Sequence, residues 1–333
     1  MDHDASDLLT SLLKDVSRSF YLTLRVLPSK VRKQISLAYL LARTSDTLAD
    51  TEILPAAARL KALTEFGARV AGERSDRIAF PEFIATQGNP AEAALLRRSE
   101  EAIELLERME EPDQRLVRDV LKVIISGQEL DLQRFSGASG QNIAGLETEA
   151  DLDDYTYRVA GVVGDFWTRL CRAHLFPNAR LKEAALIEKG VRFGRGLQLV
   201  NILRDVPKDL RQGRCYISLD LLRQAGLVPA DLLNPETHSR FRSVKHHLIL
   251  RAERLLEAGC EYMQTIPMSQ MRVRLACAWP VLIGRETLQA LRTKNVLDPA
   301  HRVKISRRRV QSLMVRSILV YPFPTLWNRQ FRS

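Results

Sequence analysis

The sequence predicts an all-α protein, and three observations favour this class. Apolar residues recur with a helical period along most of the chain, whereas the alternation typical of strands is scarce. Glycine (16) and proline (14) are few for 333 residues, as expected for long helices with few tight turns. No repeat or linker divides the chain, so we expect a single helical domain over residues 1–333.

Prolines and glycines divide the first half of the chain into amphipathic stretches. Proline suits the first turn of a helix and disrupts its interior, so Pro28 closes one expected helix and Pro55 opens another. A stretch with two prolines and a glycine, 73–90, is expected to be a loop or a broken helix. The expected helices of this half are 6–27, 29–50, 55–72, 91–109 and 112–134.

The second half begins after Gly137-Ala-Ser-Gly140, which interrupts the helical pattern. Asp151 or Asp153 is expected to cap a helix that runs to about residue 175. Pro207 is expected to kink or end a long apolar helix over 180–206. The remaining expected helices are 217–226, 237–264, 270–294 and the strongly basic 306–319.

Composition limits the partners that this protein can have. The formal net charge is +10 at pH 7, which favours anionic partners such as diphosphates, a membrane surface or nucleic acid. No recognisable nucleic-acid module accompanies this charge, so we expect no nucleic-acid partner. Four cysteines without the spacing of metal ligands are expected to be free thiols: Cys171, Cys215, Cys260 and Cys277.

The N-terminal sequence predicts a cytoplasmic protein. Met1-Asp-His-Asp is acidic, and no apolar segment typical of a signal peptide follows it. No run reaches the roughly 18 apolar residues that a spanning helix needs. Peripheral contact with the inner face of the membrane and the oligomeric state are left open.

Two aspartate pairs, each with a spacing of four residues, are the most informative motifs. Asp46-Thr-Leu-Ala-Asp50 and Asp205-Val-Pro-Lys-Asp209 each follow an apolar helical run. Residues i and i+4 lie on one helix face, about 6 Å apart, so each pair can direct two carboxylates to one point. A buried pair requires a cation, and hard oxygen ligands favour Mg²⁺ that carries a diphosphate. For the first pair alone, a solvated helix face is the alternative.

Polar residues accompany both pairs. Arg43 precedes Asp46 by three residues and can hold a phosphate or neutralise that aspartate. A polar stripe on the otherwise apolar helix of the second pair is expected to meet a ligand, with an internal hydrogen-bond network as the alternative. This stripe consists of Gln198, Asn201, Asp205 and Asp209.

Two shorter motifs add candidates. Ser17-Arg-Ser-Phe20 places an arginine between two hydroxyls, which suits a phosphate clamp or, alternatively, a solvated turn. The segment from Tyr155 to Gly164 joins phenols to small residues. Gly161 and Gly164 lower helix propensity, so close helix packing or room for a ligand has to compensate.

Together, these segments resemble the squalene/phytoene synthase family over roughly residues 10–320. The resemblance implies a single all-α domain whose helices surround a central cavity, with the aspartate motifs on opposite walls. It also implies Mg²⁺-dependent head-to-head condensation of two farnesyl diphosphates. The motifs that carry it are Ser17-Arg-Ser-Phe20, Tyr39-Leu-Leu-Ala-Arg43-Thr-Ser-Asp46-Thr-Leu-Ala-Asp50, Tyr155 to Gly164, and Gln198-Leu-Val-Asn201-Ile-Leu-Arg204-Asp205.

The resemblance also assigns roles to residues. The metal ligands would be Asp46, Asp50, Asp205 and Asp209. Tyr155 and Tyr157 are the catalytic candidates together with Asp46 and Asp205. The substrate diphosphates would be bound by Arg18, Ser19, Tyr39, Arg43, Gln198, Asn201 and Arg204, and the three arginines would also assist on phosphate oxygens of the cofactor.

The basic cluster at 302–309 is open to three interpretations: a solvated face, cofactor binding or membrane binding. Cofactor or membrane association is also open for the whole segment 302–333. Its sequence resembles the stretch that squalene synthases use near their nicotinamide cofactor, which favours squalene over phytoene as the product. The resemblance implies that Lys304 pairs with the phosphates of NADPH. Arg307 would replace a second basic residue of the family, whose position is Ser306 here.

The chain departs from the family pattern at three further positions. Ala49 and Lys208 stand where many squalene synthases have an acidic residue, so metal binding would depend on fewer carboxylates. Arg158 stands where a tyrosine is common, which leaves Tyr155 and Tyr157 as the phenolic acid/base candidates.

Three alternatives to squalene synthesis remain. A phytoene or dehydrosqualene synthase shares the chemistry up to the cyclopropyl intermediate. A non-catalytic scaffold relative is expected to lose the metal carboxylates, yet all four are present. A nucleic-acid binder would need a recognition module, which the sequence lacks.

Overall fold

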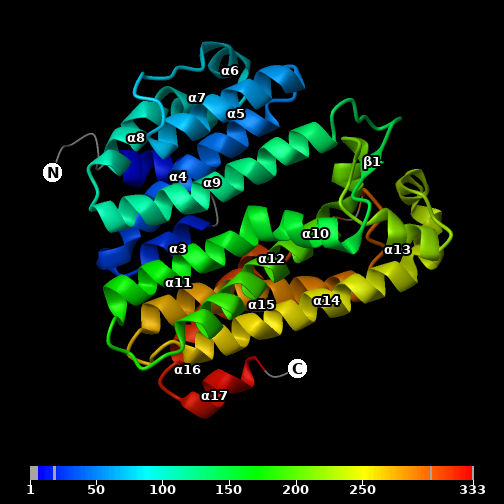
Figure 1. Cartoon of the computed structure of the whole chain (residues 1–333). Helices are drawn as coiled ribbons and strands as arrows, with labels where there is room; N and C mark the ends of the chain where they lie inside the picture. The colour runs from blue at the N-terminus through cyan, green and yellow to red at the C-terminus, as the bar shows by residue number, and fades with distance from the viewer. Residues whose placement is uncertain (1–6, 18–19, 301, 332–333) are drawn as a thin grey trace. The chain divides into compact units, whose positions relative to one another are not determined.

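The computed structural model describes residues 7–17, 20–300 and 302–331 and confirms the all-α class (Figure 1). In this part of the chain, the strands are a two-residue parallel pair, β1 (Ala144–Gly145) and β2 (Arg214–Cys215). Contacts group the chain into two compact units: Met1–Ser136 with Phe166–Asn178 form unit 1, and Gly137–Asp165 with Ala179–Ser333 form unit 2. The expectation of one domain stays a prediction.

Unit 1 is built around α4, whose bounds match the predicted helix. Its apolar residues, such as Leu37, Leu40 and Leu41, are fully buried, and α5, α8 and α9 pack against it. The helices of this unit are η1 (Leu8–Leu12), α2 (Leu13–Ser17), α3 (Phe20–Val26), α4 (Ser29–Asp50), α5 (Ala56–Ala71), α6 (Pro81–Thr86), α7 (Pro90–Arg97), α8 (Ser99–Glu107), α9 (Glu111–Arg134) and most of α11 (Val162–Leu175).

The single helix predicted over 91–109 is wrong, because the chain breaks at Arg98. This residue leaves the helical conformation (φ −102°, ψ 14°), so α7 and α8 are separate. Its guanidinium binds Asp7 at 2.6 Å and Glu101 at 2.8 Å. The contact with Asp7 comes from another part of the chain and could not be derived from the periodicity of 91–109.

Unit 2 is built around α12, which packs along α14 and α15. Within the described part of the chain, every helix is too short or too polar to span a lipid bilayer. The elements of unit 2, besides β1, β2 and the start of α11, are α10 (Glu149–Thr156), η2 (Tyr157–Gly161), α12 (Glu183–Arg211), α13 (Leu219–Gln224), η3 (Pro229–Leu233), η4 (Pro235–Thr237), α14 (His238–Thr265), α15 (Met271–Thr293), α16 (Arg307–Val320) and α17 (Pro324–Arg329).

Of the two outcomes expected at Pro207, a kink or an end of the long helix, the end is wrong. Helix α12 continues through this proline to Arg211. A proline in a helix interior removes one backbone hydrogen bond and costs about 3 kcal/mol. Packing offsets this cost, because Leu203, Val206 and Leu210 on both sides of the proline are almost completely buried. Both carboxylates of the second aspartate pair therefore belong to one continuous helix.

Glycines allow η2 and α11 to cross α12 with their backbones in contact. A Cβ added at Gly164 would lie 2.0 Å from the carbonyl oxygen of Gly190, and one at Gly194 would lie 2.3 Å from that of Ala160. Distances this short exclude any side chain. Close packing thus accounts for Gly164, and the segment that carries Tyr155 and Tyr157 is held against α12.

Candidate functional site

The first aspartate pair lies in the last two turns of α4. Asp46 accepts a hydrogen bond from Nε2 of Gln128 on α9 at 2.5 Å, and Arg43 lies 3.9 Å away. Asp50 is the exposed last residue of the helix. The two carboxylates share one helix face, as the spacing predicts.

The electrostatic environment of Asp46 is unfavourable for its charged form. Loss of hydration within the protein, followed by repulsion from Asp50, raises the pKa of Asp46 to about 6, against the lowering effects of Arg43 and Gln128. The side chain nevertheless keeps 47% of its surface accessible, so an ion can reach it. A divalent cation between the two carboxylates would relieve this repulsion.

This raised pKa predicts a pH-dependent stability. Between the ordinary value of 3.8 and about 6, the folded protein binds more protons at Asp46 than the unfolded protein. The contribution of Asp46 to the unfolding free energy therefore falls as pH rises through this interval. We expect Asp46→Asn to stabilise the metal-free protein at pH 7, on the order of 1 kcal/mol after allowance for solvent access, and to have little effect at pH 4. Urea unfolding in EDTA at both pH values measures the difference in unfolding free energy between the variant and the parent. An equal difference at pH 4 and pH 7 would contradict the raised pKa of Asp46.

The predicted phosphate ligand Arg43 already has an acidic partner. Its guanidinium binds Glu92 on α7 at 2.5 Å, and the charges of Asp46 and Glu92 raise the pKa of Arg43 despite its partial burial. Tyr39, one turn earlier on α4, is half-buried and adds to this effect. A diphosphate would have to compete with Glu92 for this arginine.

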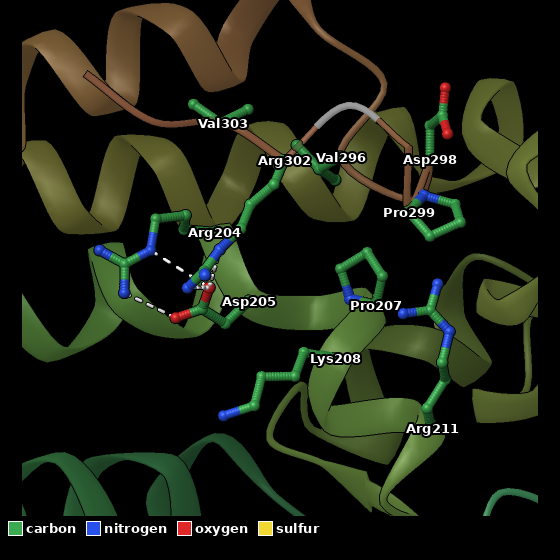
Figure 2. A pocket seen from close by; sticks show the side chains of 10 residues that line it. All are labelled: Arg204, Asp205, Pro207, Lys208, Arg211, Val296, Asp298, Pro299, Arg302 and Val303. Atoms are coloured by element: carbon green, nitrogen blue, oxygen red, sulfur yellow. Dashed lines mark hydrogen bonds and ion pairs between the residues drawn. The ribbon is translucent and has the colours of Figure 1, made fainter. Parts of the chain in front are cut away.

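The second pair lies on α12, with the polar stripe that the sequence predicts. Gln198 and Asn201 are half-buried and joined by a long hydrogen bond of 3.4 Å. Asp205 is bound by Arg204 and by Arg302, each at 2.6 Å (Figure 2). Partial burial alone would raise the pKa of Asp205, but the hydrogen bonds and charges of these two arginines outweigh it and lower the pKa below its ordinary value.

A mostly basic pocket surrounds Asp205. It lies between the C-terminal half of α12 and the segment that connects α15 to α16, and Arg302 reaches into it from that segment (Figure 2). Its charged lining combines four cationic side chains with two carboxylates, which suits an anionic ligand. The lining residues are Arg204, Asp205, Pro207, Lys208, Arg211, Val296, Asp298, Pro299, Arg302 and Val303.

Asp209 borders a different hollow. This second hollow lies between α12 and the β2 region, and its lining includes Cys215 and Tyr216. Asp205 and Asp209 therefore share a helix but line separate spaces in unit 2.

Magnesium fits the donor set of the first pair. Among the described residues, no three His, Cys, Asp or Glu side chains gather closely enough to hold a metal by themselves. Mg²⁺ usually takes only one or two protein carboxylates and completes its shell with water and phosphate oxygens, so Asp46 and Asp50 suffice. At the second pair, Arg204 and Arg302 already neutralise Asp205.

This arrangement predicts that Arg302 competes with cations for Asp205. Replacing Arg302 by alanine removes one of the two cationic partners of Asp205. The side chain of Arg302 is 59% exposed. An exposed ion pair contributes about 0.2–1 kcal/mol, so we expect Mg²⁺ to bind about 1.4- to fivefold more tightly. Calorimetric titration of the parent, Arg302→Ala and the exposed control Arg307→Ala measures this, and weaker Mg²⁺ binding in Arg302→Ala would refute it.

The other predicted residues are distributed as follows. Tyr155 stacks on Tyr216 with ring centroids 4.5 Å apart, and Tyr157 is 39% exposed. Lys304 and Arg307 are exposed and are not among the residues that line the pocket around Asp205. The predicted clamp residues Arg18 and Ser19 lie outside the described residues.

Sequence reasoning missed three partners of the aspartates and arginines. Glu92 and Arg302 come from elements distant in the sequence, and their contacts leave no local pattern. Gln128 did leave a signal, because it is an amide on the buried apolar face of α9, beside Ile124 and Ile125. A buried polar side chain on such a face requires a partner.

Comparison with known proteins gives one family. The squalene/phytoene synthase model matches residues 13–309. A bifunctional lycopene cyclase/phytoene synthase of Phaeosphaeria nodorum is 28% identical over 303 residues, which cover 89% of this chain and 48% of that protein. The squalene synthase of Saccharomyces cerevisiae is 26% identical over 241 residues, which cover 72% and 52%. The chain thus spans about half the length of these curated relatives.

Solved structures with the same fold include squalene and dehydrosqualene synthases. The chain is similar to TcSQS solved with the ligand E5700, with a TM-score of 0.79, 19% identity and coverage of 99% and 92% of the two chains. A dehydrosqualene synthase in complex with ligand gives a TM-score of 0.67, 23% identity and coverage of 95% and 96%.

Proposed function

The chain belongs to the squalene/phytoene synthase family, and we propose that it condenses two farnesyl diphosphates head to head and reduces the resulting presqualene diphosphate to squalene. The observation that carries the first half is the carboxylate pair at the end of α4. These two acidic groups are held close together and accessible, and the charged form of Asp46 is disfavoured until a cation arrives.

The aspartates would hold the metal and the arginines would bind the substrate phosphates. The proposed ligands of Mg²⁺ are Asp46, Asp50, Asp205 and Asp209. When bound, Mg²⁺ would stabilise negative charge on the leaving diphosphate. Arg43 and Arg204 would donate hydrogen bonds to its oxygens, with Tyr39, Gln198 and Asn201 beside them and Arg18 and Ser19 as further candidates.

The condensation itself requires only heterolysis and proton loss. The C–O bond of one farnesyl diphosphate breaks, its electron pair leaves with the diphosphate, and an allylic cation remains. The double bond of the second farnesyl group attacks this cation, and loss of one proton closes the cyclopropane ring. Tyr155 and Tyr157 are the proposed positions for the acid/base group. The stacking of Tyr155 on Tyr216 supports Tyr155, because it fixes the direction of the phenol.

The reductive second half is supported by the contact between Arg302 and Asp205. This contact joins the basic segment, which resembles the cofactor segment of squalene synthases, to the second aspartate motif. NADPH would supply the hydride, with its phosphates near Lys304 and Arg307. Both side chains are exposed and therefore accessible to a dinucleotide.

A phytoene or dehydrosqualene synthase is the second candidate. It is favoured by the names of two relatives that resemble this chain: a bifunctional lycopene cyclase/phytoene synthase of Phaeosphaeria nodorum and a phytoene synthase of Thermus thermophilus. Such an enzyme would end the reaction by proton loss without a hydride donor.

Product analysis separates these functions. The purified protein is incubated with Mg²⁺ and radiolabelled farnesyl or geranylgeranyl diphosphate, with and without NADPH, and the products are identified by gas chromatography and mass spectrometry. We expect presqualene diphosphate without NADPH and squalene with it. Dehydrosqualene, or phytoene from the longer substrate, irrespective of NADPH would establish the second candidate. No release of diphosphate from either substrate would refute both.

A further inference from the structure

Helices α16 and α17 lie near the C-terminus, and α16 packs on α15 of unit 2 (Figure 1). Nε1 of Trp279 donates a hydrogen bond to Ser317 on α16 at 2.9 Å, and the hydroxyl of Tyr321 donates one to the carbonyl oxygen of Met268 at 2.7 Å. Trp327 on α17 is fully buried. These anchors determine which side chains point away from unit 2.

The opposite side is apolar and exposed. Leu319 and Phe323 have 67% and 58% of their surfaces accessible, and three more apolar side chains extend the patch. This outer face consists of Val315, Ile318, Leu319, Phe323 and Leu326. Five large, exposed apolar side chains within twelve residues are more than isolated surface residues, and such a concentration indicates a binding partner.

Positive charge surrounds the outer face. Residues 299–333 contain eight lysines and arginines and no aspartate or glutamate. Arg309 binds Glu286, but Arg308 and Arg316 are exposed and have no acidic partner among the described residues. Positions 308, 312, 315 and 319 follow one another along the outside of α16, so Arg308 continues the line of Val315 and Leu319.

We propose that the outer face binds the surface of an anionic lipid bilayer. Leu319 and Phe323 insert at the boundary between headgroups and acyl chains, while Arg308 and Arg316 contact lipid phosphates. A second copy of this chain is a poorer partner, because two such surfaces would bring like charges together without an acidic residue to compensate. This surface is independent of the proposed reaction, and it would bring the protein to the phase in which long isoprenoid chains dissolve.

Vesicle binding tests the proposal. The full chain is sedimented with vesicles of phosphatidylcholine alone and with 30% phosphatidylglycerol. We expect binding to the anionic vesicles that weakens with salt, and at least tenfold weaker binding to neutral ones. Each arginine near an anionic surface contributes about 1 kcal/mol, or about fivefold in affinity, so Arg308→Gln with Arg316→Gln should lower it about 25-fold. Leu319→Gln with Phe323→Gln should lower it at least tenfold.

Matched controls separate this surface from general effects. Ile53→Gln removes a 76% exposed apolar side chain of unit 1, and Arg115→Gln removes an exposed charge of α9; neither should change binding. A Phe323→Trp variant should show a blue-shifted emission with anionic vesicles and quenching by brominated lipids. Equal binding of the parent and the Leu319/Phe323 double variant would overturn the proposal. Concentration-dependent dimerisation that this double variant abolishes would overturn it in favour of a second copy.

Discussion

Replacing Asp46 by asparagine is expected to lower the turnover of farnesyl diphosphate by at least about 10³-fold at saturating Mg²⁺. Asparagine preserves the shape of the side chain and the acceptor for Gln128, so the end of α4 should stay intact. It removes one of the two negative charges that would bind the cation, and this electrostatic stabilisation of the leaving group is a large part of such catalysis. Diphosphate release, measured with a coupled phosphate assay, checks the rate.

Two further measurements make this result decisive. The metal-free variant should unfold at a higher urea concentration than the parent at pH 7, because the unfavourable charge is gone. Asp15→Asn, on the exposed surface of α2, is a control that should change neither rate nor stability. Turnover of Asp46→Asn within tenfold of the parent would refute the metal assignment, whereas a lower stability would show a purely structural role.

Replacing Gly164 by alanine is expected to cause the largest loss of stability. The new methyl group would lie 2.0 Å from the carbonyl oxygen of Gly190, so α11 and α12 would have to move apart. Overpacking typically lowers the unfolding free energy by about 1–3 kcal/mol. Because the new methyl group would overlap backbone atoms, which cannot rotate away, we expect a loss of about 3 kcal/mol or more for Gly164→Ala. Urea unfolding gives the difference in free energy.

The control for this substitution is Gly88→Ala. A Cβ at Gly88 meets nothing within 4 Å, and the glycine does not adopt a positive φ. Alanine there should be neutral or slightly stabilising, because it reduces the freedom of the unfolded chain. A loss below 1 kcal/mol for Gly164→Ala would contradict the close crossing of α11 and α12.

Local sequence patterns predicted most of the helices. They predicted helix boundaries wrongly where contacts between residues far apart in the sequence are involved. Helix α4 has the predicted bounds because a proline before it and an apolar stripe along it are local signals. Helix α12 passes through Pro207 because its flanking residues are buried against other helices, which periodicity does not reveal. The break at Arg98 coincides with a contact that periodicity does not reveal either, because Asp7 is far away in the sequence.

For the candidate site too, the sequence predicted the local arrangement of the aspartates but not their partners from other helices. The spacing of Asp46 and Asp50 determines that both lie on one helix face. The effect of Gln128 on Asp46, and of Arg302 on Asp205, depends on tertiary packing. The two motifs share their spacing of aspartates, yet the pKa directions differ: burial and the charge of Asp50 raise the pKa of Asp46, whereas Arg204 and Arg302 outweigh the effect of burial and lower that of Asp205.

The C-terminal segment has a practical consequence for the boundaries of recombinant fragments. Arg274 is buried and lies 5.8 Å from the ring centroid of Tyr321 and 5.7 Å from that of Trp327. A fragment truncated at residue 309, where the family match stops, would lose both aromatic rings and the hydroxyl that accepts from Trp279. It would expose a guanidinium and an indole that now lie inside unit 2, and we expect such a fragment to aggregate during purification.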